Sequence, residues 1–125
     1  MTHHSRPVFL NLLQIRLPVA GIMSIAHRAA GVLLFMAIPF LVALMSAALS
    51  GQDGFLQVQG QLAQPLVKVG LFLLLWALAH HFFAGIRYLL IDVHVGVQAP
   101  RYRQSAWTVL VVSPVVALLL LWGLS

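Results

Sequence analysis

Three apolar runs, each long enough to cross a lipid bilayer, constrain the fold of this chain more than any other feature. They extend over residues 17–49, 65–91 and 106–124, and each meets or exceeds the roughly 20 apolar residues that a spanning helix needs. Hydrophobic residues make up 62% of the 125 residues and charged residues only 7%, whereas a soluble domain carries about 25% charge. The sequence therefore predicts an all-α membrane protein with three transmembrane helices.

Polar and turn-forming residues set the expected limits of the spans, which are approximately residues 22–49, 66–91 and 106–124. Pro18 and Gly21 favour a short interfacial segment over residues 16–21, before the first helix enters the membrane. Residues 50–54 form a polar turn, and residues 55–64 mix glutamine with apolar residues, which is typical of a short interfacial helix. Cysteine is absent, so this chain supplies no disulfide, thiolate or iron–sulfur ligand.

The basic residues predict the orientation of the chain in the membrane. In this threading one side carries Arg6, Arg16, Arg28, Arg87, Arg101 and Arg103, and the other side carries Lys68. The positive-inside rule then places the N-terminus in the cytoplasm and the C-terminus outside. Lys68 and Arg87 are expected to extend to opposite membrane surfaces. The net charge of +5 reflects topology and attraction to anionic lipid, and it indicates no nucleic-acid partner.

Histidines near the end of the second run need an explanation, because ionisable groups are expensive inside a membrane. His81, Gly85 and Tyr88 share one helical face, and His80 points about 100° away from it. The missing side chain at Gly85 leaves room for a flat group, and neutral imidazole is a good iron ligand, so His81 is a candidate haem ligand. The alternative is a histidine that hydrogen-bonds a neighbouring helix.

A polar stripe follows one face of the first helix. Ser24, His27, Arg28 and Gly31 are spaced i, i+3, i+4, i+7, which places them on a single face. A guanidinium group matches the fork of a carboxylate, so Arg28 and His27 can bind carboxylates such as haem propionates. The alternative for Arg28 is a plain snorkelling anchor, but its polar neighbours favour a site.

Two blocks in this order resemble a known family. The first, Ser-x-x-His-Arg-x-x-Gly, covers residues 24–31 after an Arg-Pro pair at residues 6–7, and the second, His-x-x-x-Gly-Ile-Arg, covers residues 81–87. In a three-span chain of this length they resemble the cytochrome b membrane-anchor subunit of succinate dehydrogenase, the larger hydrophobic subunit of respiratory complex II. The resemblance implies a single membrane-anchor domain over residues 1–125, which forms half of a haem-binding bundle with a partner subunit.

The resemblance also implies roles for individual residues. It makes His81 an axial ligand of haem b iron, with the other ligand supplied by a second membrane-anchor subunit. It places Ser24 and Arg28 in the ubiquinone-reduction site, and His27 and Arg28 near the haem propionates. Tyr88 stands where relatives often carry histidine, so a cofactor contact at this position is expected to come from a phenol instead of an imidazole.

The implied activity is that of a succinate:ubiquinone oxidoreductase in the bacterial inner membrane, with the C-terminus in the periplasm. Flavin and iron–sulfur clusters are expected only in partner subunits, a flavoprotein and an iron–sulfur protein. Two alternatives are a cofactor-free structural anchor for a respiratory enzyme and the anchor of a quinol:fumarate reductase. A proton-coupled transporter is disfavoured because it usually needs an acidic group deep in the membrane, and the acidic residues Asp53 and Asp92 lie at span ends.

Overall fold

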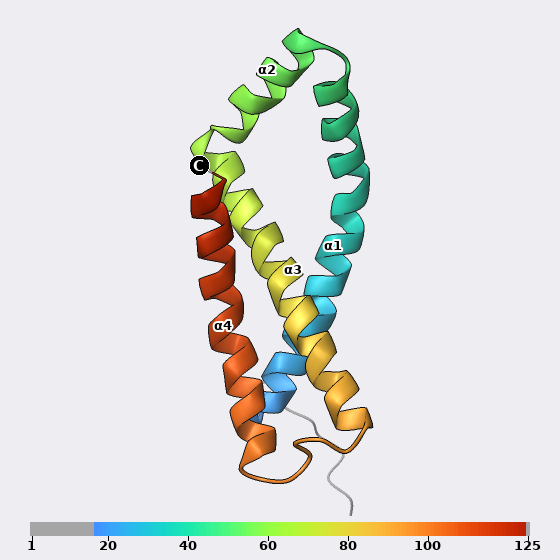
Figure 1. Ribbon diagram of the computed structural model, residues 1–125, viewed down its shortest axis with the longest axis vertical. Helices are drawn as coiled ribbons and strands as arrows, with labels where there is room; N and C mark the ends of the chain where they lie inside the picture. The colour runs from blue at the N-terminus through green and yellow to red at the C-terminus, as the bar shows by residue number, and fades with distance from the viewer. Residues whose placement is uncertain (1–16, 125) are drawn as a thin grey trace, which may run out of the picture.

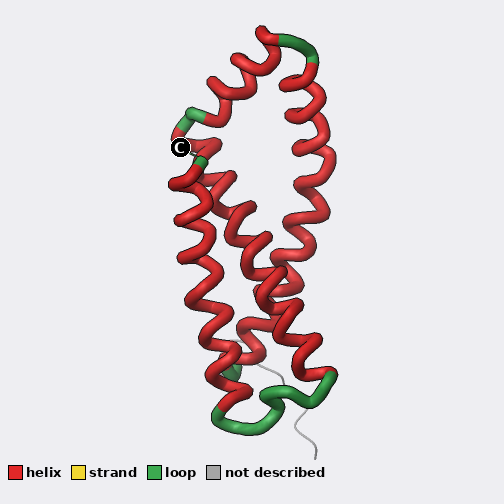
Figure 2. Tube along the Cα trace, viewed as in Figure 1, coloured by secondary structure: helices red, strands yellow, loops and turns green. Residues whose placement is uncertain are grey.

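The computed structural model describes residues 17–124, which form four α-helices (Figures 1 and 2). They are α1 (Val19–Leu49), α2 (Gln52–Leu62), α3 (Pro65–Asp92) and α4 (Arg101–Gly123). No strand occurs within residues 17–124. Because α1, α3 and α4 are each long and apolar enough to cross a membrane, the prediction of an all-α, multi-pass membrane protein is confirmed.

The first spanning helix begins earlier than residue 22. Pro18 is the N-cap of α1, and its carbonyl oxygen accepts hydrogen bonds from the backbone N–H groups of Gly21 and Ile22 at 2.8 and 3.2 Å. A proline at a helix start costs no helical hydrogen bond, because its missing N–H would have no partner there. Residues 19–21 are therefore helical. Residues 1–16, which include Arg6 and Arg16, lie outside the described part of the chain.

The three spanning helices converge at one end of the molecule and separate at the other. Figure 1 shows α1, α3 and α4 close together near the connection between α3 and α4, residues 93–100, and we call this the closed end. At the opposite end α1 diverges from α3 and α2 bridges the two helices (Figure 1). We call this the open end, and the C-terminal end of α4 lies on the same side of the molecule.

Small residues hold the helices together. The buried core cluster consists of Ala20, Met23, Ala84, Ala106 and Val109, which come from α1, α3 and α4. Among the described residues, seven of the ten buried apolar residues are alanines. Helices in a membrane gain little by hiding apolar side chains from lipid, so small residues that allow close backbone approach dominate their contacts. The core therefore joins the three spans at the closed end.

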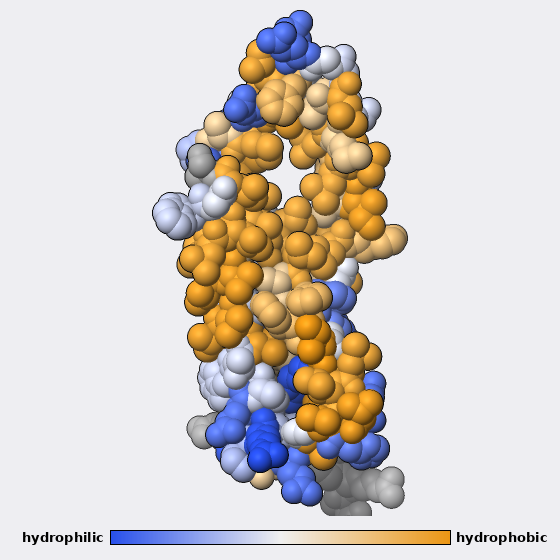
Figure 3. All heavy atoms as spheres, in the orientation of Figure 1, coloured by the Kyte–Doolittle hydropathy of each residue, from blue (hydrophilic) through white to orange (hydrophobic). Residues whose placement is uncertain are grey.

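The surface matches a chain embedded in lipid. Figure 3 shows a broad hydrophobic band over α1, α3 and α4, with hydrophilic residues at both ends of the molecule. Large apolar side chains such as Phe35 on α1 and Leu119 on α4 are exposed. Arg101 and Arg103 are exposed at the start of α4, at the closed end, and Lys68 lies in the first turn of α3, at the open end.

Candidate functional site

The ring of His81 lies against α1 in an orientation set by a hydrogen bond. Its Nδ1 atom is 3.2 Å from the backbone carbonyl oxygen of His27. Because a carbonyl can only accept, a neutral His81 carries its proton on Nδ1. Nε2 then has a free lone pair, and none of the described residues forms a hydrogen bond with it. This atom is also not fully buried. This nitrogen can therefore bind a metal.

Two neighbours in α1 fix the position of the His81 ring. The His27 ring stacks on it, with 4.2 Å between the ring centroids and 12° between the planes. A Cβ atom added to Gly31 would lie 2.9 Å from Cε1 and 3.2 Å from Nδ1 of His81, which is too close without a displacement. The sequence places Gly31 on the polar stripe of α1, but only the structure shows that this glycine makes room for His81.

Tyr88 and Gly85 complete this side of α3. The Tyr88 ring centroid is 5.3 Å from that of His27, with the rings tilted by 57°. A Cβ atom added to Gly85 would meet nothing within 4 Å, so the described residues leave open space on the helical face that Gly85 shares with His81. The structure thus brings His27, His81 and Tyr88 together, and the space expected at Gly85 is present.

Ser24 and Arg28 lie one turn apart at the closed end of α1. The Arg28 side chain is exposed, and its Nε atom donates a hydrogen bond to the backbone carbonyl of Ser24 at 3.4 Å. Residues 17–124 provide no partner for the terminal guanidinium nitrogens of Arg28 or for the hydroxyl group of Ser24. Both groups can therefore contact a molecule outside this chain.

Arg87 is enclosed between helices, a contact that the sequence did not indicate. Its side chain is only 5% exposed. Nε donates to the Ser105 hydroxyl at 2.9 Å and Nη2 donates to the Tyr102 carbonyl at 3.0 Å. The guanidinium carbon is also 4.9 Å from the centroid of the Tyr102 ring, a cation–π contact. Arg87 therefore joins α3 to α4. Its partners lie on α4, so the spacing of residues within α3 could not predict them.

His80 is enclosed between α1 and α3, about 100° around α3 from His81. Its Nε2 atom is 3.4 Å from the backbone carbonyl oxygen of Met23, and its ring stacks with that of Trp76 at a centroid distance of 5.4 Å. Its Nδ1 atom is buried and has no hydrogen-bond partner in the described residues. The sequence indicates that His80 faces away from His81, but it assigns no partner to His80.

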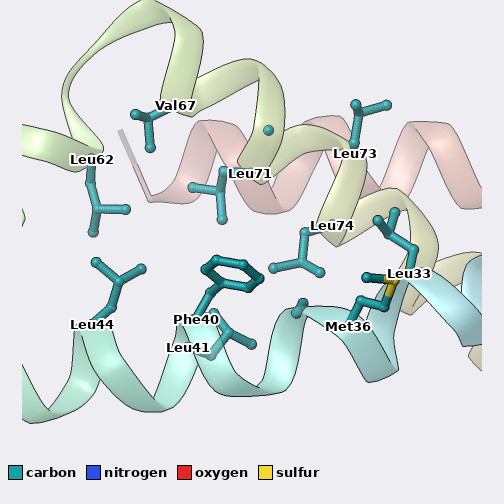
Figure 4. Close-up of a pocket in the computed structure, with 12 residues that line it drawn as sticks. Leu33, Met36, Phe40, Leu41, Leu44, Leu62, Val67, Leu71, Leu73 and Leu74 are labelled. Atoms are coloured by element: carbon teal, nitrogen blue, oxygen red, sulfur yellow. The ribbon is translucent and has the colours of Figure 1, made fainter.

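A pocket at the open end is separate from these polar residues. It has a volume of about 470 Å³ and lies between α1 and α3 (Figure 4). Its lining is apolar and includes Leu41, Phe40, Leu71 and Leu74. In the space-filling view an opening passes through the molecule between α1 and α3 (Figure 3). None of the sequence-predicted site residues lines this pocket.

Comparison with known proteins places the chain in a family. Residues 2–120 match the family described as succinate dehydrogenase/fumarate reductase transmembrane subunit. The chain is similar to the succinate dehydrogenase cytochrome b556 subunit of Coxiella burnetii (strain RSA 493 / Nine Mile phase I), with 37% identity over 109 residues that cover 86% of this chain and 87% of that protein. The protein of the same name from Paracoccus denitrificans is 30% identical over 117 residues, or 94% of this chain and 90% of that protein.

The fold and the family match define the class of this protein, which is a multi-pass membrane subunit of an oxidoreductase complex. The chain belongs to the succinate dehydrogenase/fumarate reductase transmembrane subunit family, as a cytochrome b membrane-anchor subunit of succinate dehydrogenase. The resemblance inferred from the blocks at residues 24–31 and 81–87 is thereby confirmed.

Proposed function

We propose that this chain ligates haem b through His81 and forms part of the ubiquinone-reduction site of a succinate:ubiquinone oxidoreductase. The hydrogen bond from Nδ1 of His81 to the His27 carbonyl, at 3.2 Å, carries the proposal. A histidine that binds a metal almost always donates its other ring N–H to a carbonyl or a carboxylate, which fixes the tautomer and the ring orientation. His81 has this arrangement, with Nε2 left for the iron. The relatives' name, cytochrome b556, is that of a haem protein and supports the proposal.

The second axial ligand is proposed to come from a second membrane-anchor subunit. We assign one iron ligand, His81, to this chain, and the open space at Gly85 supports a group bound beside it. Haem b, when bound, supplies one-electron redox chemistry, and this chain holds and orients it.

The polar stripe of α1 is proposed to bind two anionic or polar groups. Arg28 and His27 would bind the haem propionates, because a guanidinium group matches a carboxylate and the Nη atoms of Arg28 have no partner in the described residues. Ser24 would donate a hydrogen bond to a ubiquinone oxygen, and Arg28 would stabilise the negative charge that develops on reduction. Tyr88, beside His27, would add a phenol hydroxyl as a further polar contact to the cofactor.

The partner subunits and the orientation follow from the same assignment. Flavin and the iron–sulfur clusters belong to a flavoprotein and an iron–sulfur subunit, which pass electrons to ubiquinone at the closed end. We infer that the closed end faces the cytoplasm of a bacterial cell and that the C-terminus faces the periplasm. The exposed Arg101 and Arg103 at the closed end support this orientation through the positive-inside rule. The same residues could serve a quinol:fumarate reductase, which runs the reaction in the opposite direction.

Removal of the proposed iron ligand tests the haem assignment. The variant His81→Ala, purified within the complete complex, should lose or alter the haem b band in the dithionite-reduced minus oxidised absorption spectrum, because one axial ligand is gone. His94→Asn is the matched control, since His94 lies in the connecting loop at φ 63°, a conformation that asparagine tolerates. An assembled His81→Ala complex with an unchanged band would show that the iron is held elsewhere.

A second substitution tests the quinone assignment. Arg28→Leu should lower succinate:ubiquinone activity about 100-fold, the size of effect that follows the loss of one preorganised charge-stabilising group. Succinate oxidation by a soluble dye, which needs only the flavin, should stay unchanged. Arg103→Leu removes an exposed arginine from α4 and should leave both activities intact. Equal loss of both activities in Arg28→Leu would contradict a role at the quinone site.

A further inference from the structure

We propose that His80 is a positioning residue for the site, which it never touches. Its Nε2–H group holds the backbone carbonyl of Met23 and thereby fixes the turn of α1 from which the polar stripe projects. This inference rests on the function proposed above for His81 and for the residues of that stripe.

His80 and His81 bind two successive turns of α1. Nε2 of His80 is 3.4 Å from the Met23 carbonyl oxygen, and Nδ1 of His81 is 3.2 Å from the His27 carbonyl oxygen. Met23 and His27 are separated by four residues, about one helical turn or ~6 Å along the axis. Adjacent side chains of α3 thus hold two carbonyls that follow one another along α1. Such a pair of bonds fixes both the rotation and the register of α1 against α3.

Packing alone does not explain an imidazole at this position. His80 is 0% exposed, and Nδ1 is the one buried side-chain nitrogen or oxygen of the described residues without a partner. An apolar ring of the same shape would fill the space beside Trp76 without enclosing an unpaired acceptor, which is costly. The hydrogen bond that Nε2 donates to the Met23 carbonyl explains why a polar ring stands here.

The bond to the Met23 carbonyl gives His80 a route to the polar stripe through α1. No lipid, cofactor or partner chain can reach a side chain that this chain encloses completely. The Met23 carbonyl also accepts the helical hydrogen bond from the N–H group of His27, four residues later. Without His80, this turn loses one of the two hydrogen bonds that fix its rotation and register against α3. The His27 carbonyl would then move relative to Nδ1 of His81 and change the orientation of the proposed iron ligand.

Two variants in the complete complex separate the hydrogen bond from the packing. His80→Phe keeps a ring beside Trp76 but has no donor, whereas His80→Gln has no ring but retains a side-chain N–H that can reach the Met23 carbonyl. The measurements are the KM for a soluble ubiquinone analogue, the kcat, and the electron paramagnetic resonance g values of the oxidised haem, which respond to the orientation of a bound imidazole.

His80→Phe should raise the KM for the quinone about threefold to tenfold, the effect of one net hydrogen bond, and should shift the haem g values. Dye-linked succinate oxidation should stay unchanged, and His80→Gln should return the KM and the g values toward the native ones. Phe82→Leu is the matched control, because Phe82 lies on the same helix but is 59% exposed, and it should alter neither measurement.

A native KM and native g values in His80→Phe would overturn the inference. The inference would also be overturned if His80→Phe perturbs the KM and the g values and His80→Gln does not return them toward the native values. Failure of both variants to assemble would overturn it too. In either case the ring and its packing, and not the hydrogen bond, would determine the geometry. If only His80→Phe fails to assemble, a native spectrum in His80→Gln supports the inference. The proposed function fails separately: it is wrong if His81→Ala keeps its haem band, whatever the His80 variants do.

Discussion

The closed and open ends of the bundle differ in what joins α3 to its neighbours. At the closed end, side-chain-to-backbone hydrogen bonds from His80 and His81 reach α1, and bonds from Arg87 reach α4. At the open end, α1 and α3 face one another across a pocket of about 470 Å³ with an apolar lining (Figure 4). Geometry at the closed end is therefore fixed by directional contacts, and geometry at the open end is not.

The contrast follows from the solvent in which these helices reside. An apolar side chain that loses its helix neighbour in a membrane finds lipid instead, at little cost. A buried imidazole or guanidinium group has no such replacement and needs a partner of defined geometry. Precise placement of a site inside a membrane thus depends on polar contacts between helices, and this chain concentrates those contacts at one end.

Valine substitutions at two glycines should show the largest difference between the ends. Gly31→Val at the closed end should destabilise the complex by about 3 kcal/mol and release most of the haem, because an added Cβ would lie 2.9 Å from Cε1 of His81. Gly70→Val at the open end should be close to neutral, since a Cβ there would meet nothing within 4 Å. Haem content and thermal denaturation of the two variant complexes measure these effects. Equal effects of the two substitutions would show that the closed and open ends do not differ in this way.

Loss of the buried arginine should have the next largest effect. Arg87→Leu removes hydrogen bonds from a charged group to Ser105 and Tyr102 and should destabilise the complex by about 2 kcal/mol. The exposed Arg101 provides the control, because Arg101→Leu removes the same charge without breaking a helix contact. Thermal denaturation of the purified complexes compares the two. If both substitutions lower the midpoint equally, the charge itself matters and the contact between α3 and α4 does not.

The sequence predicted the features that composition and spacing within one helix determine. The three spans follow from hydropathy alone, because apolar length decides whether a helix can cross a bilayer. Likewise, the shared face of His81 and Gly85 follows from helical periodicity, and the structure places open space at Gly85 as expected. The start of α1 lies before the residue 22 that the sequence predicts, because Pro18, which favours an interfacial segment by composition, is the N-cap of the helix.

Contacts between helices could not be predicted in the same way. Periodicity along α3 gives the direction of a side chain, but it contains no information about the register of α1 or α4 beside it. The sequence therefore did not connect Arg87 with Ser105 and Tyr102, its partners on α4. For the same reason, the sequence did not connect Gly31 with His81, or His80 with the Met23 carbonyl.

The smallest expected effect is at the open end, where Leu41 lines the pocket and is 46% exposed. Leu41→Ala should change the stability of the complex by less than about 0.5 kcal/mol, because the side chain leaves no new enclosed cavity and lipid can replace it. Met23→Ala in the closed-end core, where Met23 is 0% exposed, should cost about 2–5 kcal/mol. Comparable costs for the two variants in thermal denaturation would mean that another chain fills the pocket in the assembled complex, and the open end would then be a packed interface.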